Sequence, residues 1–304
     1  MFYEAGMILS GIWYQFRQIA PYWAVGLIAG SLVSVFLSNK ITDKMTRLAG
    51  GKFWFMPLCI SSFLGIVSPL CMYGTVPVIA ALGRNGANAK AGVPQHLLAA
   101  FMVSSILLNP NIMLLSFALG NGIALARLGL SFLCGVLAGA LVCLLFKNKT
   151  LFSFERFSEQ QDKPKKNFLY DLFKAFRITS PYLLIGLTLT ALFDRYVPPD
   201  WVSGMFGARR GLGVLFAASL SIPLYACGGG TIPLINAWLH AGMGTGDALV
   251  FMLAGPALKI NNLSAVKMIL GVKNFFIYML YCLIFAMLSG LIINVIVEFV
   301  IKTG

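Results

Sequence analysis

The sequence predicts an all-α, polytopic membrane protein made of two inverted structural repeats with broken or re-entrant helices. Three observations support this prediction: the composition, the helix breakers inside long charge-free segments, and an ordered set of matches between the two halves. Hydrophobic residues make up 59% of the 304 residues and charged residues 11%, whereas soluble proteins average about 45–50% and about 25%. Together with a mean hydropathy of +0.84, this composition excludes an ordinary soluble domain and a disordered chain.

The chain contains about eight hydrophobic segments, and one membrane span needs about 20 predominantly apolar residues. Seven segments lack Asp, Glu, Lys and Arg altogether, and one contains only Lys259 and Lys267. In chain order the segments are residues 18–39, 53–83, 91–126, 128–146, 178–193, 211–246, 248–272 and 274–297. A net charge of +13 would suggest nucleic acid in a soluble protein. In a membrane protein it indicates basic cytoplasmic loops.

The second, third and sixth segments are too long for a plain span. As helices they would be about 46–54 Å long at about 1.5 Å per residue, against a hydrocarbon core of about 30 Å. Helix breakers lie near their middles, at residues 68–77, 108–111 and 222–233, the last with three successive glycines. Non-helical backbone at membrane depth is tolerated only inside protein or beside a water-filled cavity. We therefore expect broken helices or half-helix hairpins in these segments.

The two halves of the chain share an ordered set of residue matches. The pattern Phe16-Arg17-x-x-x-Pro21-Tyr22 recurs as Phe176-Arg177-x-x-x-Pro181-Tyr182, 160 residues later. The later matches are Pro69-Leu70 with Pro223-Leu224, Thr75-x-Pro77 with Thr231-x-Pro233, Gly86 with Gly242, and Phe101-Met102 with Phe251-Met252. The order is kept and the offset drifts only by loop-sized amounts. We therefore divide the chain into a first membrane repeat at 1–146, a basic cytoplasmic linker at 147–176 and a second membrane repeat at 177–304.

The distribution of Lys and Arg favours opposite orientations for the two repeats. If all eight segments cross the membrane, the two sides carry 12 and 10 positive side chains, which is almost no bias. If the second and sixth segments are re-entrant hairpins, the cytoplasmic side carries 16 and the other side 6, as the positive-inside rule expects. Each repeat then crosses three times, so the repeats are inverted, as in many transporters. A plain bundle of eight spans remains the alternative, and whether the second and sixth segments cross fully stays open.

Broken helices place unpaired backbone groups at mid-membrane, where they can hold an anion at a helix N-terminus or a cation at carbonyl oxygens. Lys259 lies eleven residues into the seventh segment, near the predicted midplane, where an ionisable group usually faces a cavity or a partner. Unwinding of the segment would instead let Lys259 reach the membrane surface. Asn109, which aligns with Lys259, and the nearby Asn111, Asn261 and Asn262 could line the same cavity, because buried amides are costly unless paired.

All six cysteines lie in apolar segments, and none belongs to a Cys-x-x-Cys or Cys/His pattern with zinc-like spacing. We interpret Cys59, Cys134, Cys143 and Cys282 as small core hydrophobes. Cys71 and Cys227 each lie in one of the paired breaks, where a thiolate could bind a soft metal or metalloid or could simply pack. The candidate substrate-binding residues are Cys71, Tyr73, Gly74, Thr75, Asn109, Cys227, Gly229, Thr231, Lys259, Asn261 and Asn262.

Motifs of enzymes and ATP-driven pumps are missing from the sequence. It contains no P-loop, no dinucleotide fingerprint, no catalytic triad and no carboxylate pair. We therefore expect no enzyme, no cofactor, no metal and no nucleic-acid partner. His96 and His240 lie at segment ends, where a proton relay or a satisfied interfacial histidine would both fit. The expected partners are a small-molecule substrate, membrane lipid and a coupling proton, and a homo-oligomer stays open.

Three motifs resemble the predicted-permease family that includes ArsP and YraQ. They are Pro69-Leu70-Cys71-x-x-Gly74-x-x-Pro77 followed by Gly86, Cys227-Gly228-Gly229-Gly230-Thr231-x-Pro233, and Phe251-Met252-Leu253-Ala254-Gly255-Pro256-Ala257. The resemblance covers nearly the whole chain and implies a polytopic inner-membrane permease. For the ArsP branch it implies efflux of trivalent organoarsenicals by exchange with protons or another ion. Family members often carry Cys-x-Cys-Gly in the first break, whereas this chain has Cys71-Met72-Tyr73-Gly74, so a dithiol clamp within that motif is absent.

The sequence supports three functional hypotheses. The first is a secondary permease of the prokaryotic cytoplasmic (inner) membrane that exports trivalent organoarsenicals or related small thiophilic compounds through a mid-membrane site between the repeats. The second is a transporter of a small inorganic or sulfur-containing anion, attracted by Lys259 and half-helix N-termini. The third, of another class, is a non-transporting membrane scaffold or membrane enzyme. The absence of a catalytic constellation counts against the enzyme.

Overall fold

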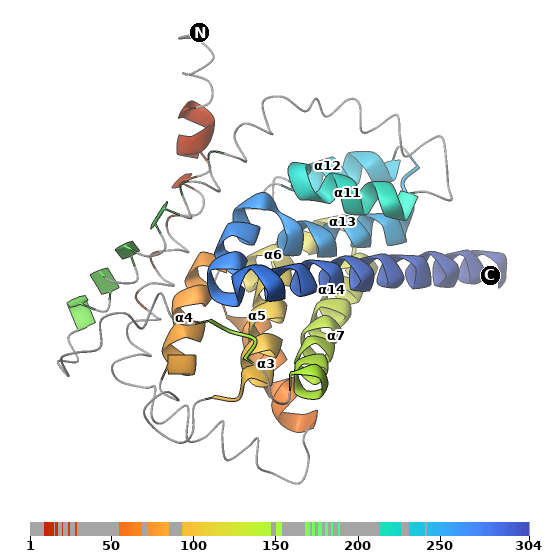
Figure 1. Cartoon of the computed structure of the whole chain (residues 1–304). Coiled ribbons are helices and arrows are strands. Elements are labelled where there is room, and N and C mark those ends of the chain that lie inside the picture. The colour runs from red at the N-terminus through yellow and green to blue at the C-terminus, as the bar shows by residue number, and fades with distance from the viewer. Residues whose placement is uncertain are drawn as a thin grey trace.

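The computed structural model describes residues 55–68, 72–84, 93–146, 150–153, 213–225, 231–240 and 242–303, with shorter pieces between 9 and 28 and between 168 and 188. These described residues form helices and short connections and contain no strand (Figure 1). The prediction of an all-helical chain is therefore confirmed for them. Most of the first and fifth hydrophobic segments and most of the linker lie outside the described residues.

The first half of the chain contributes five α-helices and one 3₁₀ turn to the described structure. They are α3 (Phe55–Val67), α4 (Met72–Arg84), α5 (Gln95–Leu107), α6 (Pro110–Ser116), η2 (Phe117–Leu119) and α7 (Asn121–Leu145). Helix α6 starts at Pro110, whose missing N–H is not needed at a first helical position, and the Asn109 side chain accepts a hydrogen bond from the Ile112 backbone N–H at 2.9 Å. Gly120, with φ at 114°, turns the chain into α7.

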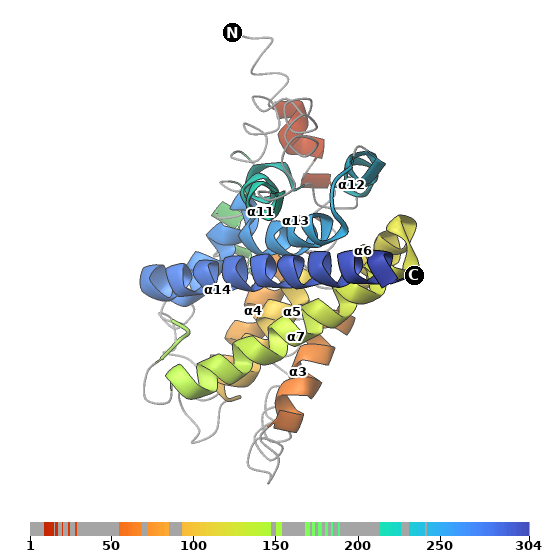
Figure 2. The ribbon, with the colours of Figure 1, turned by 90° about the vertical axis from the view of Figure 1, so that its right-hand side faces the viewer.

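The second half contributes four described helices. They are α11 (Gly213–Leu224), α12 (Thr231–His240), α13 (Thr245–Leu258) and α14 (Ile260–Thr303). Gly271, with φ at 69°, interrupts α14, which is therefore a short and a long helix joined at a kink. The long part of α14 runs between the two groups of helices, with α11, α12 and α13 on one side and α3, α4, α5 and α7 on the other (Figures 1 and 2).

The order of elements repeats between the halves. Helices α3, α4 and α5 correspond to α11, α12 and α13, and α6 and α7 correspond to the two parts of α14. The packing repeats as well, because α3 contacts α5 and α7 as α11 contacts α13 and α14. Positive-φ glycines, Gly120 and Gly271, precede the long helix in both halves. The repeated order of helices thus agrees with the residue matches in the sequence.

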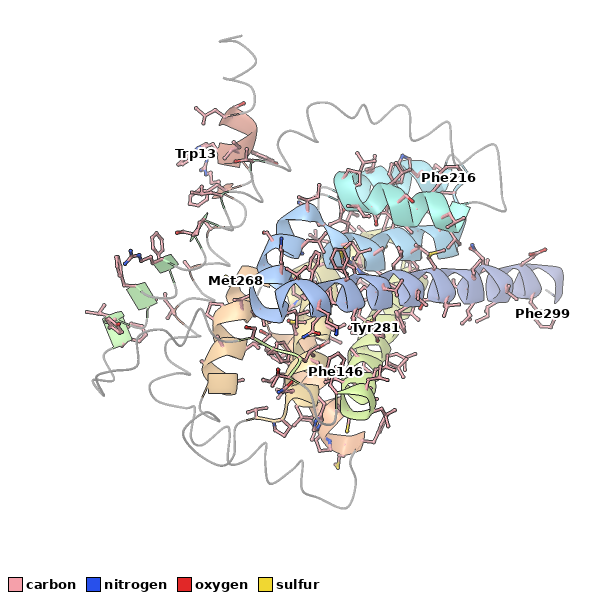
Figure 3. All side chains as sticks on the ribbon, in the orientation of Figure 1. Trp13, Phe146, Phe216, Met268, Tyr281 and Phe299 are labelled. Carbon is pink, nitrogen blue, oxygen red and sulfur yellow. The ribbon has the colours of Figure 1, made fainter. Side chains whose placement is uncertain are left out.

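Two described helices are long and apolar enough to cross a membrane, namely Asn121–Leu145 and Asn262–Phe299. The pair Gln95–Leu107 and Ile112–Leu119 is bent by 48° and makes a third candidate if it counts as one broken span. Large apolar side chains are exposed along α7 and α14, Phe299 among them (Figure 3). Hydrocarbon accommodates such a surface, whereas contiguous apolar patches of this size are rare on soluble monomers. The chain is therefore an integral membrane protein.

Glycines allow the helices of each half to pack closely. On α7, a Cβ added at Gly139 would lie 2.8 Å from the backbone carbonyl oxygen of His96 at the start of α5. Where α13 crosses α14, a Cβ at Gly246 would meet the carbonyl oxygen of Gly290. Small residues serve this purpose in membrane proteins because lipid supplies no hydrophobic force between helices, so close packing has to hold them together.

Two sequence predictions about the breaks are wrong in detail. Gly74, Thr75 and Pro77 were expected in non-helical backbone but lie inside α4, because a proline near a helix start removes only one backbone hydrogen bond. Lys259 was expected within a helical span but has extended backbone at the C-terminal end of α13, with φ at −54° and ψ at 135°. The chain turns at this residue so that α14 can fold back and pack against α13.

Candidate functional site

Equivalent helix interruptions in the two halves define the candidate site. In the first half α5 ends at Leu107 and α6 begins at Pro110, with Asn109 between them. In the second half Lys259 alone separates α13 from α14. The Lys259 side chain is only 2% exposed. Asn109 and Lys259, which the sequence alignment of the two halves pairs, each lie at one of these interruptions.

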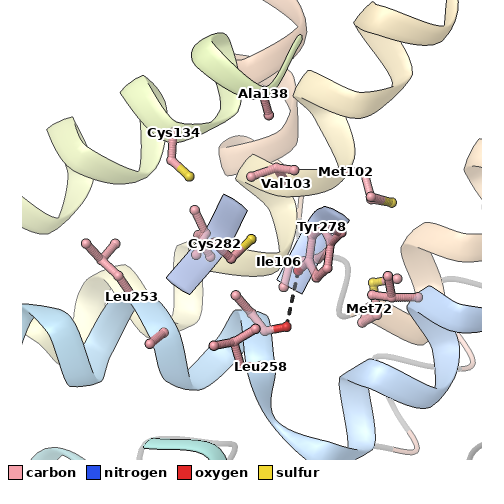
Figure 4. Packing of buried hydrophobic residues seen from close by; sticks show 14 of the residues in the cluster. Met72, Met102, Val103, Ile106, Cys134, Ala138, Leu253, Leu258, Tyr278 and Cys282 are labelled. Carbon is pink, nitrogen blue, oxygen red and sulfur yellow. Dashed lines mark hydrogen bonds between the residues drawn. The ribbon is translucent and has the colours of Figure 1, made fainter. Parts of the chain in front are cut away.

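In the last turns of α13, three carbonyls that lack a helical donor accept hydrogen bonds from side chains instead. Pro256 has no N–H, so the carbonyl of Met252, four residues earlier, lacks its helical donor. The end of the helix leaves the carbonyls of Pro256 and Ala257 without helical donors. Arg127 donates to the Met252 carbonyl at 3.1 Å and Asn262 to the Pro256 carbonyl at 2.6 Å. The Tyr278 hydroxyl donates to the Ala257 carbonyl at 3.2 Å, the bond drawn as a dashed line in Figure 4. Specific side-chain hydrogen bonds therefore stabilise this helix interruption.

Arg127 of α7 is the most heavily bonded of these side chains, and it is 1% exposed. Besides the bond to Met252, Nη1 donates to the Ser116 hydroxyl at 2.8 Å and Nη2 to the Tyr225 hydroxyl at 3.2 Å. The guanidinium thus joins α6 and α7 of the first half to α13 and to Tyr225, which follows α11, of the second. Its Nε and the hydroxyl of Ser131 have no hydrogen-bond partner. The three acceptors are neutral, so no anionic group among the described residues compensates the charge.

Tyr225 connects this arginine to the predicted break of the second half, because it directly follows α11 and precedes Cys227 by two residues. Its ring lies against Gly255, where an added Cβ would meet the ring carbons. Gly255 therefore makes room for Tyr225, and the adjacent Pro256 frees the carbonyl that Arg127 binds. This gives the Gly-Pro pair in the motif at residues 251–257 a structural purpose: both residues position partners of Arg127.

The predicted threonines pack against neighbouring helices. Thr75 of α4 is buried and shares a hydrogen bond with the Ser105 hydroxyl of α5 at 3.2 Å. Thr231, its match, is buried at the start of α12. Gly74 is buried beside Thr75 in α4. These residues lie inside or at the start of helices and not in the non-helical breaks where the sequence placed them.

The structure tests only part of the predicted site. It brings Lys259 and Asn262 together at one break and places Asn109 at the other. Outside the described residues lie Cys71, Cys227 and Gly229, and so do the side chains of Tyr73, Asn111 and Asn261.

Sequence reasoning missed Arg127. The charge count treats it as one of six positive side chains in loops on the outer side, but it is buried inside α7. The signal that could have found it is the turn-forming run Gly120-Asn121-Gly122. A helix that starts at this run already contains Arg127, because no proline intervenes before residue 145.

Two of the four described cysteines lie in the packed interior. Cys134 of α7 and Cys282 of α14 are buried in the core (Figure 4), which confirms their interpretation as core residues. Cys59 and Cys143 are partly exposed. A cavity of about 80 Å³ lies between α5, α7 and α14 and is lined mainly by apolar side chains, Met102 and Leu141 among them. Arg127 and Lys259 do not line it, so this cavity is separate from the candidate site.

Comparisons with known proteins identify the family. Residues 4–295 match the family model ArsP_1, described as a predicted permease. The UPF0718 protein YcgR of Bacillus subtilis is 21% identical over 300 residues, which cover 91% of this chain and 93% of that protein. A Streptococcus mutans protein, named as a candidate two-component membrane permease complex subunit, is 22% identical over 286 residues, 88% of this chain and 91% of that protein.

A UPF0718 protein of Methanocaldococcus jannaschii is 27% identical over 138 residues, but the match covers 45% of this chain and only 38% of that protein. No solved structure matches the chain. The family model spans nearly the whole sequence and agrees with the resemblance carried by the motifs around the breaks. The chain belongs to the ArsP_1 family of predicted permeases.

Proposed function

We propose that this chain is a secondary permease of the prokaryotic cytoplasmic (inner) membrane, which moves a small solute through a mid-membrane site between two inverted repeats. The first repeat comprises residues 1–146, the second comprises residues 177–304, and a cytoplasmic linker at 147–176 joins them. Membership of a permease family supports transport, the repeated order of helices supports the repeats, and the excess of Lys and Arg on one side supports their inversion.

The observation that carries the proposal is the pair of interruptions in equivalent helices of the two halves, at the half-buried Asn109 and the buried Lys259. Secondary transporters commonly use discontinuous helices near the bilayer midplane to hold solute and coupling ion. Arg127 ties helices of one half to helices of the other near the second interruption. Alternating access of the site would require these bonds between the halves to rearrange.

Two substrate classes fit this site. Trivalent organoarsenicals or related thiophilic compounds, exported in exchange for a proton or another ion, are supported by the family resemblance and by Cys71 and Cys227 as soft ligands. A small inorganic or sulfur-containing anion is supported by two buried cations, Lys259 and Arg127. The name of the Streptococcus mutans relative adds a second membrane subunit as a proposed partner.

Flux into proteoliposomes tests the proposed function. The purified full-length protein is expected to transport methylarsenite or at least one of thiosulfate, sulfite and phosphate above the level of protein-free liposomes. A proton gradient is expected to change that rate if a proton is the coupling ion. Absence of flux for every compound, in either orientation of the gradient, would favour the scaffold or membrane enzyme.

Removal of the two break cysteines tests the thiophilic substrate class. Cells that express the Cys71→Ala, Cys227→Ala double variant at wild-type level are expected to lose resistance to methylarsenite, because the trivalent arsenic loses its sulfur ligands. Cys143→Ala is the matched control, since Cys143 is a partly exposed residue of α7, and its resistance should equal that of wild type. Full resistance in the double variant would refute the thiol role.

Neutralising Lys259 tests the anion class. Lys259→Met is expected to lower the rate of anion uptake by about tenfold or more, which corresponds to about 1.4 kcal/mol, because a 2% exposed cation is lost from the centre of the protein. The control Lys273→Met removes an exposed cation of α14 and should leave uptake unchanged. Equal uptake in the two variants and wild type would count against the anion class.

A further inference from the structure

We propose that Arg127 and Ser131 form an anion-binding subsite of the permease and that the solute it carries is a small oxyanion. This inference rests on the proposed function and commits to one of its two substrate classes. It starts from two polar groups on one face of α7, the Nε of Arg127 and the hydroxyl of Ser131, that are buried and have no partner.

The guanidinium of Arg127 has hydrogen-bond donors to spare. Of its five N–H groups, three are used by neutral acceptors: the Ser116 hydroxyl, the Tyr225 hydroxyl and the Met252 carbonyl. The Nε hydrogen and one Nη1 hydrogen remain. A buried donor without an acceptor costs about 1–3 kcal/mol, and more for a charged group. An acceptor that enters the site would remove this cost.

Ser131 differs from three other buried serines of the described helices, which bond within their own helix. Ser104, Ser105 and Ser221 each donate to a carbonyl of their own helix, at 2.8, 3.1 and 2.7 Å. This is the usual arrangement for a serine inside a helix. The Ser131 hydroxyl makes no such bond, and it lies one turn from Arg127, so the two side chains are neighbours on the surface of α7. Both donors are therefore available to one ligand.

Among the described residues no carboxylate compensates the charge of Arg127, which favours an anion as that ligand. Asp247, the buried carboxylate of α13, accepts a hydrogen bond from the Asn294 side chain at 2.9 Å and makes no bond to Arg127. A lone cation in a low-dielectric interior is costly, and a neutral solute would not offset this cost. Oxyanions match the planar N–H geometry of arginine, and the Ser131 hydroxyl can donate to a further oxygen.

The bonds of Arg127 also connect the subsite to movement of the halves. The side chain is almost completely covered, so an anion reaches Nε only when a covering element moves. Tyr225 contacts the same guanidinium, because its hydroxyl accepts a hydrogen bond from Nη2 at 3.2 Å. Occupation of the subsite and rearrangement of the contact between the halves are thus coupled through one side chain.

Thermal unfolding of the full-length protein in detergent tests the subsite. Thiosulfate, sulfite and phosphate are titrated against chloride at constant ionic strength, and at least one oxyanion is expected to raise the unfolding temperature in a saturable way. Arg127→Lys is expected to weaken the apparent affinity by about tenfold or more, because an ammonium lacks the planar donors. Ser131→Ala is expected to weaken it several-fold, and the control Ser221→Ala should bind as wild type does.

The proposal is overturned if no oxyanion stabilises the protein, or if Ser131→Ala and Arg127→Lys bind with wild-type affinity. Ser131→Ala removes one unpartnered hydroxyl, so it keeps the test decisive even if the arginine variant fails to fold. A different result would contradict the proposed transport function and leave the subsite intact. In that case oxyanion binding would depend on Arg127 and Ser131, but no solute would cross the membrane of proteoliposomes. Solute flux that is unaffected by both variants would keep the permease and remove the subsite.

Discussion

Gly246→Leu is expected to prevent the permease from folding. Gly246 lies where α13 crosses α14, and an added Cβ would meet the carbonyl oxygen of Gly290 and the side chain of Asn294. Because the first obstacle is backbone, the helices have to separate. Overpacking typically costs about 1–3 kcal/mol, and separation would also break the hydrogen bond from the Gly246 N–H to Asn294 at 2.8 Å. We expect the loss to reach the upper end of that range or exceed it.

The measurement for this variant is the yield of monodisperse protein after detergent extraction, together with its unfolding temperature. Gly129→Leu is the matched control, because a Cβ at Gly129 in α7 has no atom within 4 Å. The control should extract and unfold as wild type does. A Gly246→Leu protein with normal yield and normal unfolding temperature would contradict the close crossing of α13 and α14.

Pro256→Ala is expected to make the protein more stable and less active. Alanine restores the N–H that can bond the Met252 carbonyl, and a proline in a helix interior costs about 3 kcal/mol. The restored helical bond competes with Arg127, which donates to the same carbonyl. Arg127 is then held less firmly between the halves, and we expect solute flux to fall by about tenfold, a change of about 1.4 kcal/mol.

The unfolding temperature and the solute flux in proteoliposomes are measured on the same preparation, and the first is expected to rise while the second falls. Pro57→Ala is the control: Pro57 lies in the first turn of α3, where a proline removes no helical hydrogen bond, so flux should be unchanged. If Pro256→Ala transports at the wild-type rate despite a raised unfolding temperature, the bond between Arg127 and Met252 has no part in transport.

Local chemistry explains which parts of the fold could be predicted from sequence. Asn109 and Pro110 end one helix and start the next because one side chain caps a helix and the other lacks an N–H. These effects act within a few residues, so the break between α5 and α6 follows from the sequence. The same argument failed for Pro77, which lies inside α4, because packing around a helix can offset the loss of one hydrogen bond.

The candidate site was harder to predict, because its bonds join residues far apart in the chain. Arg127 meets Tyr225 and Met252, 98 and 125 positions away. No periodicity or spacing in the sequence links these three residues. Arg127 itself sits at the boundary of two apolar segments, where a charge usually marks a loop. Only the position of the turn at Gly120-Asn121 hinted that it belongs to a helix.

By itself, the sequence determined the membrane class, the break between α5 and α6, and the family, since these depend on composition and on residues close together in the chain. The tertiary structure alone decided that Arg127 is buried between the two halves and that Ser131 beside it lacks a partner. The physical reason is that the environment of a charged side chain depends on which distant helices pack around it. Here Arg127 contacts α6, α13 and Tyr225, which follows α11, from both halves of the chain.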